Sequence, residues 1–342
     1  MNTLSWLVSV NMMAACATNA AAPETGPDAN GSGNGAPAPV DDYCNATDPR
    51  TVPIAIAATP EAGEAPYLEA LAGAQTSIDV AIYLMGSGGI LDQLEAKARA
   101  GVAVRVILDQ HKIATNQKYY DRLVAAGAQA KWSSPEFAFF HAKFFVVDRA
   151  AAVMSTGNYS KSFSIELERN FVATDRDPAD VADLGALFEA DWTGQAAILP
   201  CTRMVIAPIN ARDRILAVIA SANTTLEIES MQFADPGVRD AVRARAAAGV
   251  RVRALLADPD WIDANADAAG FLAGLGVPVK HIPHLHTKAI VADGTVAYVG
   301  SENLSYTSLE SNREVGVVVV ESYSVAPVTT TFELDWAAGV DF

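Results

Sequence analysis

Positive charge is scarce in this sequence. Its 342 residues carry 24 Lys and Arg against 40 Asp and Glu, which gives a formal net charge of −16. A field of that sign repels polyanions unless basic residues gather in one place, so non-specific coating of nucleic acid is disfavoured. Charged residues make up only 19% of the chain and hydrophobic residues 51%, which excludes a wholly disordered protein. We therefore expect a folded protein with an acidic surface.

No apolar run in the sequence predicts a membrane-spanning helix. The run over residues 4–15 is too short to cross a bilayer and ends in small residues just before Cys16, which predicts a signal peptide over residues 1–16. The segment Met13-Ala-Ala-Cys16 resembles the bacterial lipoprotein signal. That resemblance implies lipidation of Cys16 and an extracytoplasmic, membrane-anchored lipoprotein; an ordinary secreted or periplasmic protein is the alternative. Residues 17–43 have little that could bury surface and predict a flexible tether.

Cysteine is rare as well. With Cys16 assigned to processing, only Cys44 and Cys201 remain, and an oxidising compartment favours a disulfide between them. Such a bond would contribute about 2–4 kcal/mol to stability, and two unrelated thiols are the alternative. No cysteine stands at ligand spacing beside His281, His284 and His286, so we expect no metal site there.

What the chain does contain is an internal repeat. Residues 76–83 are echoed by residues 224–231, and residues 100–108 by residues 248–256. Each half alternates strands and helices, which predicts an α/β fold of two homologous α/β/α sandwich halves with mainly mixed or parallel sheets. The expected halves are residues 44–200 and 201–342, with helices near 90–100 and 118–126 in the first and near 238–247 and 264–274 in the second. Homologous halves often pack about a pseudo-two-fold axis, so we expect one site built from both.

The same polar constellation stands near the end of each repeat. In both copies Lys follows His by two positions, Asp follows by seven and Asn by seventeen; the residues are His141, Lys143, Asp148, Thr156 and Asn158, and His286, Lys288, Asp293, Ser301 and Asn303. Positions i and i+2 of a strand face the same side, so each His projects beside its Lys. The Asn follows on the next strand, after a turn at the Asp.

These residues resemble the phospholipase D superfamily, whose double H-x-K-x4-D motif and trailing hydroxyl-x-Asn occur here within residues 50–338. The resemblance implies a metal-independent phosphodiesterase without cofactors, in which His141 is the nucleophile, His286 the general acid/base and Glu314 an orienter of imidazole. Arg169 stands opposite Glu314 by count, with Glu168 adjacent, and Asn170 aligns if one residue is inserted. Which residue orients His141, and which His attacks, therefore remain open.

A phosphodiester resists attack because it is anionic, so a site needs positive charge, a nucleophile and an acid for the leaving oxygen. Lys143 and Lys288 would give charge, and two histidines that titrate near neutrality suit the other two roles. We expect Asn158, Asn303, Thr156 and Ser301 to be neutral donors, the last two as substrate-binding hydroxyls, and Asp148 and Asp293 to be structural.

The expected substrate is a phospholipid, because a membrane anchor and an acidic balance favour lipid over nucleic acid. We expect a monomer without a stable nucleic-acid partner, and transfer to an alcohol is chemically available besides hydrolysis. The lack of membrane-spanning helices disfavours the cardiolipin-synthase branch. The alternatives are an inactive anchored binding module and an extracytoplasmic nuclease, for which basic residues flank the motifs: Lys131, Lys161, Arg169, Lys280 and Arg313.

Overall fold

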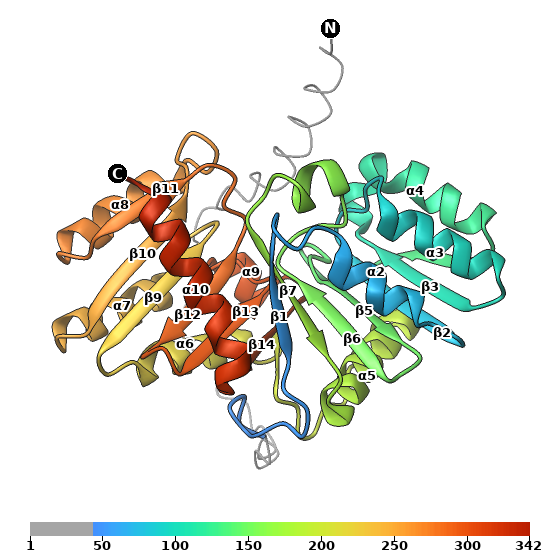
Figure 1. Cartoon of the computed structure of the whole chain (residues 1–342), viewed down its shortest axis with the longest axis horizontal. Coiled ribbons are helices and arrows are strands. Elements are labelled where there is room, and N and C mark those ends of the chain that lie inside the picture. The colour runs from blue at the N-terminus through green and yellow to red at the C-terminus, as the bar shows by residue number, and fades with distance from the viewer. Residues whose placement is uncertain (1–43) are drawn as a thin grey trace, which may run out of the picture.

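The computed structural model describes residues 44–342. The expected signal peptide, the lipidation site Cys16 and the tether fall in residues 1–43, outside the described residues, and stay predictions. The described strands form one sheet of seven and one of eight, each belonging to one half of the chain. The first half is on the right of Figure 1, in blue to green, and the second on the left, in yellow to red.

The first half alternates strands and helices as its sequence pattern predicts. Its elements are β1 (Ala55–Thr59), α2 (Ala65–Ala72), β2 (Ser77–Ile82), α3 (Gly89–Arg99), β3 (Ala103–Leu108), α4 (Ile113–Ala125), β4 (Gln129–Trp132), β5 (Lys143–Val147), β6 (Ala151–Ser155), β7 (Asn170–Asp175) and α5 (Pro178–Thr193). The strand order is β1-β7-β6-β5-β2-β3-β4. Strands β2, β3 and β4 run parallel, whereas β5, β6, β7 and β1 pair antiparallel, so the sheet is mixed.

The second half repeats this plan. Its elements are β8 (Met204–Ala207), α6 (Ala211–Ser221), β9 (Thr225–Ser230), α7 (Pro236–Ala247), β10 (Arg251–Ala257), α8 (Ala264–Gly274), β11 (Val279–Ile282), β12 (Lys288–Ala292), β13 (Val296–Gly300), α9 (Tyr306–Glu310), β14 (Glu314–Val319), α10 (Ser322–Ala338) and β15 (Val340–Asp341). The strand order β11-β10-β9-β12-β13-β14-β8 mirrors that of the first sheet, with β15 added beyond β11. The prediction of two similar α/β halves with mixed sheets is confirmed.

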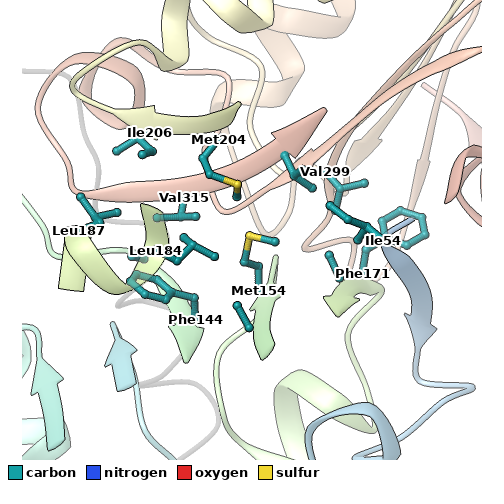
Figure 2. Packing of buried hydrophobic residues seen from close by; sticks show 14 of the residues in the cluster. Ile54, Phe144, Met154, Phe171, Leu184, Leu187, Met204, Ile206, Val299 and Val315 are labelled. Atoms are coloured by element: carbon teal, nitrogen blue, oxygen red, sulfur yellow. The ribbon is translucent and has the colours of Figure 1, made fainter. Parts of the chain in front are cut away.

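The two halves share a hydrophobic core. Phe144 and Met154 of the first sheet lie in one buried cluster with Met204 and Val315 of the second, and α5 and α10 add apolar residues to it. Figure 2 shows the two methionines facing each other across the junction. Residues of this shared core alternate along β5 and β12 with residues of the two outer cores, so the packing fixes which face of the sheet each side chain of these strands points to.

A disulfide joins Cys44 to Cys201, which are 157 residues apart with Cα atoms 4.7 Å from each other. Cys44 precedes β1, and Cys201 lies between α5 and β8, so the bond ties the start of the described chain to the segment between the halves, as the sequence predicts. Nearby, Arg50 and Arg203 both bind the buried carboxylate of Asp180 on α5, at 2.6 and 2.8 Å. The segment before β1 is thus held covalently and by buried ion pairs.

Candidate active site

The two His-Lys pairs occupy equivalent places in the two halves. His141 lies just before β5, which begins at Lys143, and His286 lies just before β12, which begins at Lys288. Lys143 Nζ donates to the backbone oxygen of His141, and Lys288 Nζ donates to that of His286 at 2.6 Å. All four side chains are buried. Two ammonium groups are therefore enclosed with two imidazoles in the interior of the molecule.

Each histidine is held through its backbone by the opposite half. His141 N donates to Arg313 O at 2.9 Å, and His286 N donates to Arg169 O at 3.1 Å. In return Arg313 N donates to Phe139 O, and Arg169 N to His284 O, each at 3.0 Å. These reciprocal bridges lie just before β14 and β7 and relate the halves as a pseudo-two-fold axis would.

The side chain of His141 also meets the opposite half. Its Nδ1 lies 2.8 Å from Oε1 and 2.7 Å from Oε2 of Glu314, the first residue of β14. Ser308 and Asn312 donate to the same carboxylate. The residue that contacts the imidazole of His141, left open by the sequence, is thus Glu314 from the other copy of the motif.

His286 meets an amide where His141 meets a carboxylate. Its Nδ1 lies 3.0 Å from Oδ1 of Asn170, the first residue of β7. Asn170 therefore matches Glu314, as the alignment with one inserted residue predicts. The extra residue is accommodated by a π-helical turn at Lys161–Ile165, where the second half has the α-helical α9.

Arg169, which stands opposite Glu314 by count, is the counterpart of Arg313. Arg169 pairs with Asp335 on α10 at 2.7 Å, and Arg313 pairs with Asp191 on α5 at 3.0 Å. The two acidic residues belong to a second repeat, Phe-Glu-x-Asp-Trp at residues 188–192 and 332–336. The sequence pattern carries this repeat, which was not recognised as a signal, but only the packing of the halves shows that each half's last helix binds the other half's arginine.

The hydroxyls of Thr156 and Ser301 face the strands beside them. Thr156 Oγ1 donates to Asn170 Oδ1 at 2.9 Å and accepts from Phe171 N at 3.0 Å. Ser301 Oγ accepts from Val315 N at 3.1 Å. Thr156 thus positions the amide that contacts His286. Asn158 and Asn303 are also buried, but they lie in the segments just after β6 and β13 rather than on these strands, so the prediction of a strand position was wrong.

Asp148 and Asp293 lie at the far ends of β5 and β12. Asp148 Oδ1 accepts from the backbone N of Thr76 and Ser77, and Asp293 Oδ1 accepts in the same way from Thr224 and Thr225. Although partial burial opposes it, these hydrogen bonds lower the pKa of Asp148 to about 2, and the equivalent bonds lower that of Asp293. Both carboxylates fasten the turn after the His-Lys strand to the start of the neighbouring strand.

Both imidazoles are poorly suited to carry charge in the free protein. Burial, then the nearby Lys143 and Lys288, lowers the pKa of His141 to about 4, against an opposing effect of Glu314. Burial and the two lysines lower the pKa of His286 well below its usual range. The site therefore holds neutral imidazoles beside two lysines, an arrangement that an anionic ligand would complement.

Aromatic rings flank the imidazoles. The ring of Tyr83 lies 4.5 Å from that of His141, and Trp261 stacks 6.2 Å from His286. His281 lies 3.2 Å from a carboxylate oxygen of Asp258, whereas His284 lies beside Trp261.

Among residues 44–342, no group of three or more His, Cys, Asp or Glu side chains is arranged to hold a metal ion. In the same part of the chain, no helix has the length and apolar character to cross a membrane.

The sequence matches known proteins over most of its folded part. The family model described as "Cardiolipin synthase, PLD-like domain" matches residues 67–192 and 215–336. The mitochondrial cardiolipin hydrolase of Xenopus tropicalis is 32% identical over 130 residues, which cover 37% of this chain and 61% of the relative. A cardiolipin synthase of Clostridium perfringens (strain SM101 / Type A) is 25% identical over 279 residues, covering 67% of this chain and 58% of the relative. The chain thus spans about three fifths of the length of these relatives.

Solved structures share the fold. The phosphatidylserine synthase of Haemophilus influenzae Rd KW20 superimposes with a TM-score of 0.66 at 13% identity, covering 84% of this chain and 87% of that one. The polyphosphate kinase of Porphyromonas gingivalis gives a TM-score of 0.67 at 16% identity, covering 83% and 47%. Since the segments matched by the family model make up most of the chain and include both His-Lys pairs, the chain belongs to the phospholipase D-like (PLD-like) family.

Proposed function

We propose that this protein is a phosphodiesterase that cleaves its substrate through a phosphohistidine, with His141 as nucleophile and His286 as general acid/base. The observation that carries this proposal is the crossed arrangement of two buried His-Lys pairs, each imidazole contacted by a side chain of the opposite half. A site of this kind supplies a neutral nitrogen nucleophile, a second nitrogen for proton transfer and two positive charges.

The unequal partners of the two imidazoles support this division of roles. When an imidazole nitrogen bonds to phosphorus, the ring gains positive charge. The carboxylate of Glu314, 2.7 Å from His141 Nδ1, can balance that charge. Asn170 is neutral and offers His286 an acceptor without a charge, which suits a ring that must both give and take a proton.

The reaction then takes two steps. His141 Nε2 attacks phosphorus, the bond from phosphorus to the leaving alcohol breaks, and protonated His286 donates its proton to the departing oxygen. Neutral His286 next takes a proton from water, the hydroxide attacks phosphorus, and the bond to His141 breaks. Lys143 and Lys288 balance the charge of the non-bridging oxygens in both steps. An alcohol in place of the water gives transfer instead of hydrolysis.

We propose a phospholipid as the substrate. The relatives are named cardiolipin hydrolase and cardiolipin synthase, which supports a lipid. The synthase match also weakens the sequence-based argument against that branch, so transfer stays part of the proposal. Lipidation at Cys16, an extracytoplasmic location and a monomeric state are proposed on the sequence alone.

The environment of the flanking basic residues also favours lipid over nucleic acid. Lys131 and Lys280 donate to the backbone oxygens of Trp192 and Trp336. Arg169 and Arg313 are paired with buried aspartates, and Lys161 lies 3.7 Å from Glu64. Because three of these five lie beside carboxylates of the protein, they offer less free positive potential to a nucleic-acid backbone.

Turnover of bis(4-nitrophenyl) phosphate with a chelator present tests the reaction. We expect His141→Ala and His286→Ala each to abolish turnover, whereas His281→Ala, outside the two pairs, retains it. Survival of turnover in either site variant would refute the proposed chemistry. Parallel incubation with phospholipid vesicles and single-stranded DNA tests the substrate, since cleavage of DNA with intact lipid would establish the nuclease alternative. A phosphoryl group mapped to His286 after rapid quenching would reverse the two roles.

A further inference from the structure

Three residues lead into β7 and three lead into β14, the last of each three being the first residue of the strand. The two sets contain the same residue types in opposite order. The first half has Glu168-Arg169-Asn170, and the second has Asn312-Arg313-Glu314. The central arginines are equivalent, since each bridges to the other half's histidine segment and pairs with the other half's last helix. The carboxylate and the amide on either side of the arginine have therefore exchanged places.

The exchange changes which group contacts each imidazole directly. In the second half the carboxylate of Glu314 meets His141, and the amide of Asn312 lies behind it and donates to Oε1 at 3.0 Å. In the first half the amide of Asn170 meets His286. The carboxyl group of Glu168 lies behind, with Oε2 4.0 Å from His286 Nδ1.

Asn170 is held in one orientation. Its Nδ2 donates to Ser164 O at 2.8 Å, and its Oδ1 accepts from Thr156 Oγ1 at 2.9 Å. The amide oxygen, rather than the amide nitrogen, therefore faces His286. This oxygen cannot balance a positive charge on the ring, and Lys288 Nζ, 3.1 Å from the same Nδ1, opposes such a charge, so any countercharge for His286 must come from elsewhere.

Glu168 is placed to supply it. Its side chain is 1% exposed. Hydrogen bonding from Ser164 and Asn170 and the charge of Lys288 act on its carboxyl group, while Oε2 accepts no hydrogen bond from the part of the chain that the structure describes. A carboxyl group buried in this way is costly unless it has a charge partner or stays protonated. The atom without a hydrogen bond, Oε2, is the one that lies 4.0 Å from His286 Nδ1.

We propose that Glu168 is the positioning residue of His286, a carboxyl group that balances the imidazolium while that ring serves as the general acid. This inference rests on the proposed function. The neutral pair, protonated Glu168 with neutral His286, and the charged pair, ionised Glu168 with protonated His286, contain the same number of protons. Substrate binding selects the charged pair, because the phosphate lies beside the lysines and offsets their repulsion of the imidazolium.

The surrounding charges support this exchange of one proton. The titratable groups that act on His286 or on Glu168 are Lys143, Lys288 and His141, with Glu314 beyond His141. Both lysines disfavour a charged His286, which leaves Glu168 as its nearest carboxyl group in the described structure. Burial raises the pKa of Glu168 to about 7, so that this carboxyl group can hold a proton near neutral pH.

The variant Glu168→Gln keeps the shape of the side chain and removes its charge. We expect kcat/KM for a dialkyl phosphodiester, whose leaving group needs an acid, to fall about 100-fold, and that for bis(4-nitrophenyl) phosphate to fall less than about 3-fold. The alkaline limb of the pH profile should move down by about one pH unit. Glu166→Gln, an exposed neighbour that lies 3.9 Å from Lys161, is the matched control and should match the wild type.

An equal loss with both substrates, or no loss with either, would overturn the proposal for Glu168. Inactivity of the wild-type protein towards both would overturn the proposed function instead. NMR titration of His286 separates the two cases because it needs no turnover. With inorganic phosphate bound, the state in which the charged pair forms, the pKa of His286 should be lower in Glu168→Gln than in the wild type by about one unit, and an unchanged value refutes the inference even if the enzyme is active.

Discussion

The two halves of the molecule agree in strand order and in the placement of the His-Lys pair, but they differ at the side chain that contacts each imidazole. In one half an ionised carboxylate lies within 2.8 Å of the ring, and in the other an amide lies at 3.0 Å with a carboxyl group 4.0 Å away. The features that the halves share, the strand order and the buried His-Lys pair, build the site and enclose its positive charge. The feature in which they differ, Glu314 beside His141 and Asn170 beside His286, makes the two imidazoles chemically unequal.

The largest loss of activity should come from removing the charge of Glu314, the carboxylate that contacts His141. We expect Glu314→Gln to reduce kcat/KM by about 10²- to 10⁴-fold, since the charge that develops on His141 loses its counterion. Asn170→Ala removes one neutral hydrogen bond and should cost only about tenfold. Steady-state kinetics of both variants at one pH measure the ratio. Equal losses would mean that the two rings are equivalent, contrary to the roles proposed above.

A smaller effect, on stability, should follow from opening the disulfide that encloses the first half. We expect the double variant Cys44→Ser/Cys201→Ser to lose about 2–4 kcal/mol of unfolding free energy, measured by urea denaturation under non-reducing conditions. Ser221→Ala, at the exposed last residue of α6, is the control and should keep the wild-type midpoint. An unchanged midpoint in the double variant would show that the buried Arg50 and Arg203 pairs hold this segment without the covalent bond.

The smallest effect should come from the two turn aspartates, and it should be alike in both halves. Because the folded pKa values of Asp148 and Asp293 are lowered, their stabilisation is present above the unfolded value near 3.8 and is lost as the pH falls. Asp148→Asn and Asp293→Asn should each lower the melting temperature by a few degrees at pH 7. The gap to the wild type should close as the pH approaches 2, which thermal scans across pH can follow. A gap that persists in acid would mean that the carboxylate charge contributes nothing.

Much of the fold could be predicted from the sequence because its signals are local. The period-2 strands, the Ala-Gly-Val turns and the two-residue spacing of His141 and Lys143 each depend on neighbours along the chain. The crossed contacts could not be predicted in this way. Whether Glu314 meets His286 of its own half or His141 of the other depends on how two sheets pack, over a separation of 173 residues.

The place of Asn170 was difficult for a related reason. Counting puts Arg169 opposite Glu314, and only the π-helical turn at Lys161–Ile165 reveals where the extra residue is absorbed. The sequence offered Asn170 as one alignment among two, and the backbone decides between them. Glu168 stood out in the sequence only as the acidic neighbour of Arg169, and its relation to His286 follows from the distance between them.

The linker between the halves has a consequence for how such a site can diversify. A homodimer of one identical half would have to give both imidazoles the same partner, because every change in one subunit appears in the other. Joining two copies in a single polypeptide removes that constraint, so that each copy can mutate independently. The reversed order of Glu168-Arg169-Asn170 and Asn312-Arg313-Glu314 is a difference that a homodimer of one half could not encode.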